Sequence, residues 1–194
     1  MKTIALLAPL ALLGGCTTPA YVSPVEVTRF SDDAAGALGR GPIAVVPAPG
    51  VESSFEAAAF QAAVADELTQ LGYLVTGDMA QQVAEVSVER FTERAGYQRS
   101  PVDVGVGGST GSYGSGVGMG VGINLGGRPA DRINTELRVL IKPSGGGNAL
   151  WEGRAHLIAT TNSDYADNRA AAGKMADALF RGFPGRSGET IEVR

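Results

Sequence analysis

An alternation of apolar and polar residues runs through residues 133–141 and constrains the fold more than any other part of the chain. Polar residues such as Glu136 and Arg138 separate the positions Ile133, Thr135, Leu137, Val139 and Ile141. A period of two residues is typical of a β-strand with one buried and one solvated face. A glycine-rich turn at 143–148 leads to a second alternating segment at 150–157. Because this connection is short, we expect the two strands to be antiparallel neighbours.

Two other segments carry the helical period instead. Ser53 stands three residues before Glu56, a capping-box pattern, and Gly72 follows as a stop signal. Between them, apolar residues recur at helical spacing: Phe60, Val64, Leu68 and Leu71. A last helix is predicted to begin near the capping residues at 162–164 and to end at Pro184. Its apolar face would hold Tyr165, Ala172, Ala176, Leu179 and Phe183.

The order of elements predicts the fold class. Shorter strands are expected near 25–30, 43–46, 73–75 and 84–88. Strand, helix, several strands and helix in succession indicate an α+β fold, a two-layer sandwich with a mainly antiparallel sheet and two helices packed on one face. We expect a single α+β domain whose core includes Trp151, Leu137, Val139, Leu68 and Leu179. Trp151 is expected to pack under a helix rather than to line a binding site. This domain would cover residues 25–185, followed by a loose polar C-terminal tail at 186–194.

The first residues resemble the export signal of bacterial lipoproteins. A charge at Lys2 precedes an apolar run at 4–13, and Leu-Leu-Gly-Gly-Cys, ending at Cys16, has the form of a lipobox. The apolar run is too short to cross a bilayer, which takes about 20 residues. We therefore expect residues 1–15 to be a lipoprotein signal peptide. The alternative is an ordinary secretory signal cut after Ala20.

The same resemblance implies a membrane anchor and a location. It implies a thioether-linked diacylglycerol on Cys16 and a further acyl chain on its amine, followed by a lipidated tether at 16–24. One acyl chain binds membranes marginally, whereas two or more anchor a protein stably. In such lipoproteins an aspartate after the cysteine retains the protein at the inner membrane, and here Thr17 follows. The implied location is the cell outer membrane, on its periplasmic side.

Charge and cysteine content narrow the classes of partner. Removal of residues 1–15 takes away only Lys2 of the 16 basic residues, which leaves 15 against 20 acidic ones. No run of five or more basic residues occurs, and phosphate backbones are bound by clustered Lys and Arg. We therefore expect no nucleic-acid partner. The single cysteine is assigned to the lipid, so the core is expected to hold together without a disulfide.

One pattern suggests catalysis. Residues 107–111 read G-x-S-x-G around Ser109, and Asp131 and His156 follow in the order used by α/β-hydrolases. That elbow needs a helix directly after the serine, and here more glycine follows. We therefore expect a protein that is not an enzyme. With one histidine, no phosphate loop and only scattered carboxylates such as Glu85 and Glu89, we also expect no cofactor and no metal.

The chain resembles the bacterial lipoproteins of the domain of unknown function 4136 family. The patterns that match are the strand at 43–47, Leu68 with Gly72 and Tyr73, the strand at 86–88, Leu-Trp-Glu-Gly-Arg-Ala at 150–155 and the Phe-Pro ending at 183–184. They extend over most of residues 25–185. The resemblance implies an anchored envelope domain with no known activity. The glycine-rich insert at 102–127 is richer in glycine than the family leads one to expect.

This insert is predicted to be a β-hairpin. Apolar residues occupy one parity, namely Val102, Val104, Val106, Val117, Met119, Val121, Ile123 and Leu125. Glycine occupies most of the other parity, so one face is apolar and the other is nearly bare backbone. The competing interpretations are a glycine stripe on a helix and a flexible linker. A helix would lose about 1 kcal/mol at each glycine.

The sequence thus favours a lipid-anchored periplasmic envelope domain with a non-enzymatic interaction or assembly role. The membrane would be held through Cys16, and an envelope protein partner could be met through the hairpin at 102–127. The alternative is a small-molecule or glycan binder that uses the sheet face left open by the helices. A serine hydrolase built on Ser109 is the least favoured hypothesis.

Overall fold

The computed structural model describes residues 18–32, 38–51, 54–77, 79–96, 102–111, 114–123 and 129–194. These form two compact units. The main unit comprises Ala20–Ala95 and Ala130–Arg194, and the hairpin unit contains the strands between Gly96 and Pro129. The elements are β1 (Val25–Ser31), β2 (Gly41–Pro47), α1 (Phe55–Gln70), β3 (Tyr73–Val75), β4 (Gln82–Glu93), β5 (Val102–Gly111), β6 (Gly114–Ile123), β7 (Arg132–Pro143), β8 (Trp151–Thr160), the 3₁₀ turn η2 (Asp164–Ala166), α2 (Asn168–Phe180) and β9 (Glu189–Val193).

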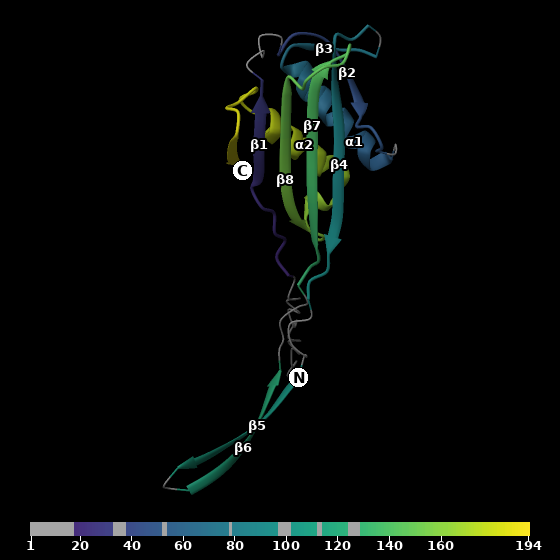
Figure 1. Ribbon diagram of the computed structural model, residues 1–194. Coiled ribbons are helices and arrows are strands. Elements are labelled where there is room, and N and C mark those ends of the chain that lie inside the picture. Colours follow the sequence, from purple (N-terminus) through teal and green to yellow (C-terminus); the bar gives the residue numbers. More distant parts are fainter. Residues whose placement is uncertain are drawn as a thin grey trace, which may run out of the picture. The chain divides into compact units, whose positions relative to one another are not determined.

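The main unit is an α+β sandwich, as predicted. Seven strands form one sheet in the order β3-β2-β4-β7-β8-β1-β9, and α1 and α2 cover one of its faces (Figure 1). β2 runs parallel to β3 and β4, and the other neighbouring strands are antiparallel. β7 and β8 are adjacent, with Leu137 opposite Ala155, which confirms the hairpin expected from their short connection.

The core lies between the helices and one face of the sheet, to which every second residue of each strand contributes an apolar side chain. Trp151, Leu137, Val139, Leu68 and Leu179 belong to one cluster, and each is fully buried. This confirms the predicted core. The polar parity faces solvent, because no described helix covers that side of the sheet. One further aromatic group, Phe180, stacks on the Trp151 ring with 5.4 Å between the ring centroids.

Both helices start at a different residue from the one predicted. α1 is capped by Ser54 and not by Ser53, since the Ser54 side chain accepts a hydrogen bond of 3.0 Å from the Ala57 N–H. α2 does not begin at 162–164. A 3₁₀ turn occupies that region, and Asp167 caps the helix by accepting from the N–H groups of Arg169 and Ala170. Several residues with capping side chains stand in a row at each site, so the sequence pattern does not single out the one that makes the cap.

The tail at 186–194 is not loose, so that prediction is wrong. Residues Glu189–Val193 form β9, which pairs antiparallel with β1 and places Val193 opposite Val25. Ile191 and Val193 contact the core on the helix side, and Glu192 between them is exposed. The outer edge of β1 provides the hydrogen-bonding partners, so a short polar segment becomes the edge strand of the sheet.

The hairpin unit contains the predicted β-hairpin. β5 and β6 pair antiparallel over ten residues each, from Val102 opposite Ile123 to Gly111 opposite Gly114. Leu125, which the prediction placed on the same apolar parity, lies outside the described residues. The structure therefore confirms the strand pairing within the insert.

Candidate functional site

The N-terminal segment of the main unit lies along the end of β8. The Tyr21 N–H donates to the Thr160 hydroxyl at 2.9 Å, and the Ser23 N–H donates to the Ile158 carbonyl at 2.8 Å. The end of the predicted tether is thus fixed against the sheet. Cys16 and Thr17 lie outside the described residues.

Asp131 joins the two ends of the insert at the same place. Its carboxylate accepts a 2.9 Å hydrogen bond from the Ala95 N–H, and its carbonyl accepts one of 2.9 Å from the Thr161 N–H. Ala95 follows β4 and is the last residue of the main unit before the insert, and Asp131 precedes β7 and is the second residue of the main unit after it. The predicted tether and both ends of the insert therefore leave the main unit at one end of its sheet.

The proposed hydrolase residues are not brought together in the main unit. His156 lies opposite Glu136 in the β7–β8 register, five residues along β7 from Asp131. Five residues of strand span roughly 16 Å. The Asp131 carboxylate accepts the hydrogen bond from the Ala95 N–H, and Ser109 belongs to the hairpin unit. Among the described residues, no group of three or more His, Cys, Asp or Glu side chains is placed to hold a metal ion.

The open sheet face carries a row of charged and polar residues across five strands. His156 stands between Glu136 and Glu26 in the register, and the row ends at Glu89 and Glu192. Beside this row, Glu152 accepts from Arg138 at 2.9 Å and from Arg154 at 2.7 Å. Glu85 pairs with Lys142 at 2.6 Å, and thus it serves an ion pair on this face. These residues make the open face polar and highly charged.

Burial raises the pKa of Glu152, but the hydrogen bonds from Arg138 and Arg154 outweigh burial and hold that pKa below its ordinary value. A carboxylate with a depressed pKa stabilises the fold above its unfolded pKa of about 4.3, and this stabilisation is lost as the pH falls through the folded pKa. Glu152→Gln should therefore have a lower free energy of unfolding than the unaltered protein at about pH 7. This difference between the two proteins should become smaller at about pH 3. Urea unfolding at both pH values measures it.

The matched control is Glu26→Gln on the same face, where the register partners are His156 and Glu192 rather than arginines. We expect a smaller deficit at neutral pH for this variant. If the loss of unfolding free energy in Glu152→Gln stayed constant or grew as the pH fell, the two arginines would not be lowering the pKa of Glu152.

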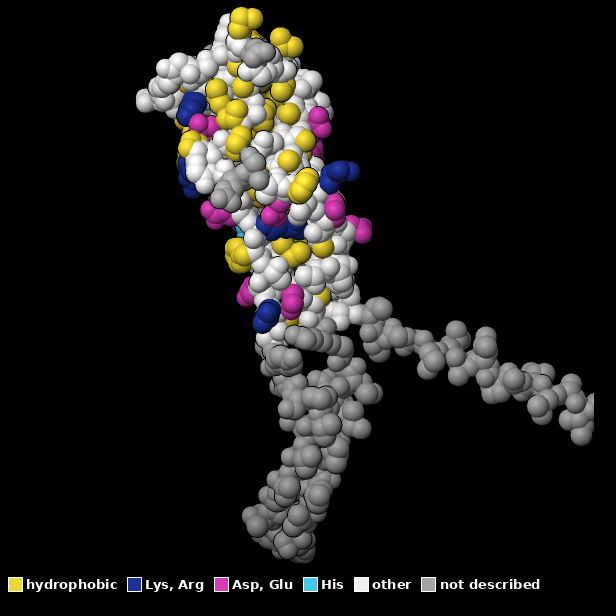
Figure 2. Space-filling view, turned by 90° about the vertical axis from the view of Figure 1, so that its right-hand side faces the viewer, with side chains coloured by type: hydrophobic (Ala, Val, Ile, Leu, Met, Phe, Trp, Pro, Cys, Tyr) yellow, Lys and Arg dark blue, Asp and Glu magenta, His cyan; other side chains and the backbone are white. Residues whose placement is uncertain are grey.

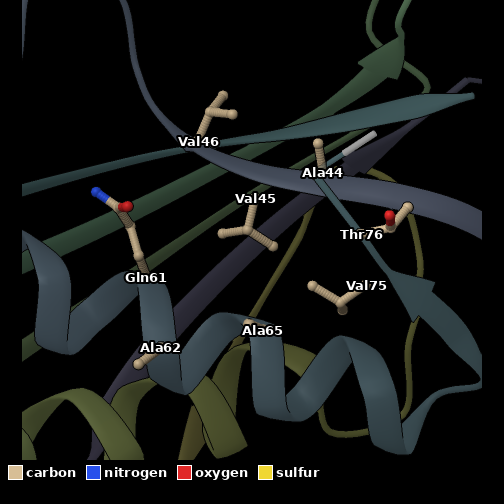
Figure 3. Close-up of a pocket in the computed structure, with 9 residues that line it drawn as sticks. Ala44, Val45, Val46, Gln61, Ala62, Ala65, Val75 and Thr76 are labelled. Atoms are coloured by element: carbon tan, nitrogen blue, oxygen red, sulfur yellow. The ribbon is translucent and has the colours of Figure 1, made fainter. Parts of the chain in front are cut away.

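A groove of about 390 Å³ lies at the other edge of the sheet, between β2, β3 and α1. In Figure 3, Val45 of β2 and Val75 of β3 lie above Ala62 and Ala65 of α1. Figure 2 shows hydrophobic side chains gathered in the upper half of this side of the main unit. The lining includes only two polar side chains, Gln61 and Thr76. This groove is therefore apolar, and it lies at the sheet edge and not on the open face.

Two arginines, the buried Arg29 and the partly buried Arg90, serve the ends of helical segments. Arg90 donates to the carbonyls of Tyr165 and Ala166 at 3.2 and 2.7 Å, and it lies 3.7 Å from a carboxylate oxygen of Glu56. Arg29 donates to carbonyls at the end of α2. Both charges thus have structural roles that the sequence analysis did not identify. A charged residue on the apolar parity of a strand was the available signal.

Across the described ranges, no helix combines the length and the hydropathy needed to span a membrane.

Comparisons with known proteins add the fold but no activity. No model of a known protein family matches the chain. The uncharacterized protein ZMO1243 of Zymomonas mobilis is 29% identical over 217 aligned positions, which cover 88% of this chain and 80% of that protein. Two solved structures of a PelC dodecamer from Paraburkholderia phytofirmans are 12% and 11% identical, with TM-scores of 0.46 and 0.48 and coverage of 84% of this chain and 99% of theirs.

A PDZ domain protein from Parabacteroides distasonis is 14% identical with a TM-score of 0.50. The match covers 89% of this chain and 38% of that protein. At this level of identity the likeness concerns the fold alone.

Proposed function

We propose that the chain is a lipid-anchored periplasmic envelope domain, held on the outer membrane through Cys16, with a non-enzymatic interaction or assembly role. The lipobox at 12–16 supports the anchor. Membership of the domain of unknown function 4136 family belongs to the same proposal. Nucleic acid is not a proposed partner, because acidic residues outnumber basic ones and the open face carries many carboxylates.

The observation that carries this function is the common exit of the tether and the insert. Tyr21, Ala95 and Asp131 lie at one end of the sheet, joined through hydrogen bonds to Thr160, Thr161 and each other. Three residues separate Cys16 from Ala20, so the two Cα atoms are at most about 14 Å apart. A lipid on Cys16 would therefore keep this end of the main unit close to the membrane. The open charged face and the apolar groove would remain accessible to periplasmic partners.

The groove supports a second candidate, the binding of a small molecule. Its volume of about 390 Å³ falls within the usual range of ligand sites, roughly 300–1,000 Å³. Gln61 and Thr76 would orient a mostly apolar ligand there. A glycan would instead suit the open face, where Phe91 is exposed beside the charged rows.

Replacing Cys16 by serine tests the anchor. We expect Cys16→Ser to accumulate as unprocessed precursor or as soluble protein, because the acyl chains supply the membrane affinity. Fractionation of the envelope and the mass of the mature N-terminus measure the result. Thr17→Asp is the matched variant, and it should remain lipidated but move to the inner membrane fraction. An unchanged outer membrane fraction for Cys16→Ser would show that the lipobox interpretation is wrong.

A further inference from the structure

The hairpin unit has two open strand edges. Among the described strands, β5 and β6 pair only with each other, so each has an outer row of backbone N–H and C=O groups directed away from its partner. The two strands are ten residues long, or about 33 Å. A two-stranded sheet is marginally stable in water by itself. This hairpin therefore gains stability from any strand that extends it.

These edges lack the features that prevent pairing with other strands. Proteins protect an edge with a short strand, with proline or with charged residues. β5 and β6 contain no proline and only one charged residue, Asp103. The edges of the main sheet differ: β3 is three residues long, and β9 carries Glu189 and Glu192. The same chain thus protects one sheet at both edges and leaves the other open.

The register makes the hairpin suited to a second copy of itself. From Val102 to Val106, apolar residues lie opposite apolar residues, as in Val104 with Val121 and Val106 with Met119. Glycine lies opposite glycine on the other face, as in Gly105 with Gly120. A partner strand must supply an edge of similar length with few charges and the same alternation, and another hairpin of this chain meets each requirement. Pairing of like hairpins would continue both the apolar face and the glycine face.

We infer that hairpins of neighbouring copies pair edge to edge through β5 and β6 and form a shared sheet. Because each hairpin has two open edges, this association can continue beyond a dimer. The inference rests on the proposed anchor in one respect. Copies held on one membrane surface meet at a high effective concentration, which favours weak strand pairing. The partner is thus a second copy of this chain, recognised by its backbone.

The first test is the size of the full-length protein in detergent, by sedimentation. We expect the unaltered protein to be an oligomer. We expect the oligomer to be lost in a variant of the same composition in which apolar residues lie on both faces of β6. That variant combines four substitutions, Gly118→Met, Met119→Gly, Gly122→Ile and Ile123→Gly. The melting of the main unit should not change, which verifies its folding. A monomeric unaltered protein, or an oligomer that survives the exchange, would overturn the inference.

The second test uses single cysteines in the Cys16→Ser background, where no other cysteine remains. A Val104→Cys protein is mixed with proteins that carry a cysteine at successive positions of β5 or β6, and disulfides between copies are quantified. Paired strands should give yields that alternate with a period of two residues. Thr190→Cys on β9 is the control and should show only background. Yields without this period would mean random collision and would overturn the inference.

These tests separate failure of the inference from failure of the proposed function. The crosslinking pattern is measured without the lipid, whereas the anchor is decided by fractionation of Cys16→Ser. A third outcome is a hairpin that binds lipid vesicles while the protein remains monomeric. That outcome would overturn pairing between copies in favour of a lipid surface as the partner.

Discussion

Replacing Gly153 by alanine should lower the free energy of unfolding by about 3 kcal/mol, the upper part of the range for overpacked cores. Gly153 lies on the helix-facing side of β8, two residues after Trp151. A Cβ atom at this position would overlap Cη2 of Trp151 and lie 2.8 Å from Cδ1 of Leu179. Two carbon atoms that are not bonded to each other cannot approach so closely, so the indole ring would have to move.

The indole has little freedom to move. Its Nε1 donates a 2.9 Å hydrogen bond to the Pro184 carbonyl, and its ring lies 5.1 Å from the centroid of Phe183 and 5.4 Å from that of Phe180. A shift of Trp151 would break this hydrogen bond and disturb both aromatic contacts. The loss should therefore exceed that of an ordinary added methyl group.

Gly173→Ala is the matched control. Gly173 lies within α2, and a Cβ atom there would meet nothing within 4 Å. In an open helical position, alanine is favoured over glycine by roughly 1 kcal/mol. The same substitution should thus stabilise the protein at one glycine and destabilise it at the other, as measured by chemical denaturation. Equal effects would show that the space over Gly153 is not closed by Trp151.

The sequence predicted those parts of the fold in which periodicity and burial agree. The alternation at 133–141 arises because one face of β7 meets the helices and the other meets solvent. The stripe of Phe60, Val64 and Leu68 is fully buried for the same reason on α1. Trp151 was placed correctly because a large aromatic on the apolar parity of a strand packs under a helix.

The errors arose where the deciding interaction lies far away in sequence. β9 is polar and short, and it becomes a strand only because β1 offers it an edge across some 160 residues of chain. The start of α2 was misplaced because residues 162–167 include several capping side chains, and tertiary packing selects Asp167. Local signals cannot rank such alternatives.

The candidate sites were harder to predict than the fold. Asp131 drew attention as a possible catalytic residue, but its observed role is to hold Ala95 beside the start of β7. Spacing alone cannot reveal that clamp, since it depends on where the insert leaves and re-enters the sheet. The groove beside β2 was not predicted either. It is lined by small side chains from three elements, each of which looks like ordinary core in the sequence.

Arg29 was recognised as part of the first strand, but its role depends on contacts with α2. Its side chain is 6% exposed and is directed toward the helices, like those of Val25 and Val27. Nε donates to the Leu179 carbonyl at 2.9 Å, and Nη2 donates to the carbonyls of Ala178 and Arg181 at 3.1 and 2.8 Å. The last carbonyls of a helix have no partner within the helix, so Arg29 supplies the donors that α2 lacks.

The charge of Arg29 persists despite its burial. Burial lowers the pKa of Arg29, and the nearby Glu189 carboxylate acts in the opposite direction. An arginine nevertheless stays protonated throughout the pH range in which proteins fold. The hydrogen bonds from Arg29 to α2 should therefore stabilise the fold at every such pH, whereas the ion pairs of Glu152 are lost in acid.

Removing the hydrogen bonds from Arg29 to α2 should have the second large effect on the stability of the fold. We expect Arg29→Ala to lower the free energy of unfolding by about 3 kcal/mol or more, because each buried acceptor left without a donor costs about 1–3 kcal/mol. Arg29→Lys should recover only part of this loss, since one ammonium cannot reproduce the planar fork that reaches three carbonyls.

Arg154→Ala on the open face is the matched control, and an exposed pair there is worth at most about 1 kcal/mol. Denaturant unfolding, together with hydrogen exchange at the end of α2, measures both. A loss for Arg29→Ala no larger than that of the control would mean that α2 is held by packing alone.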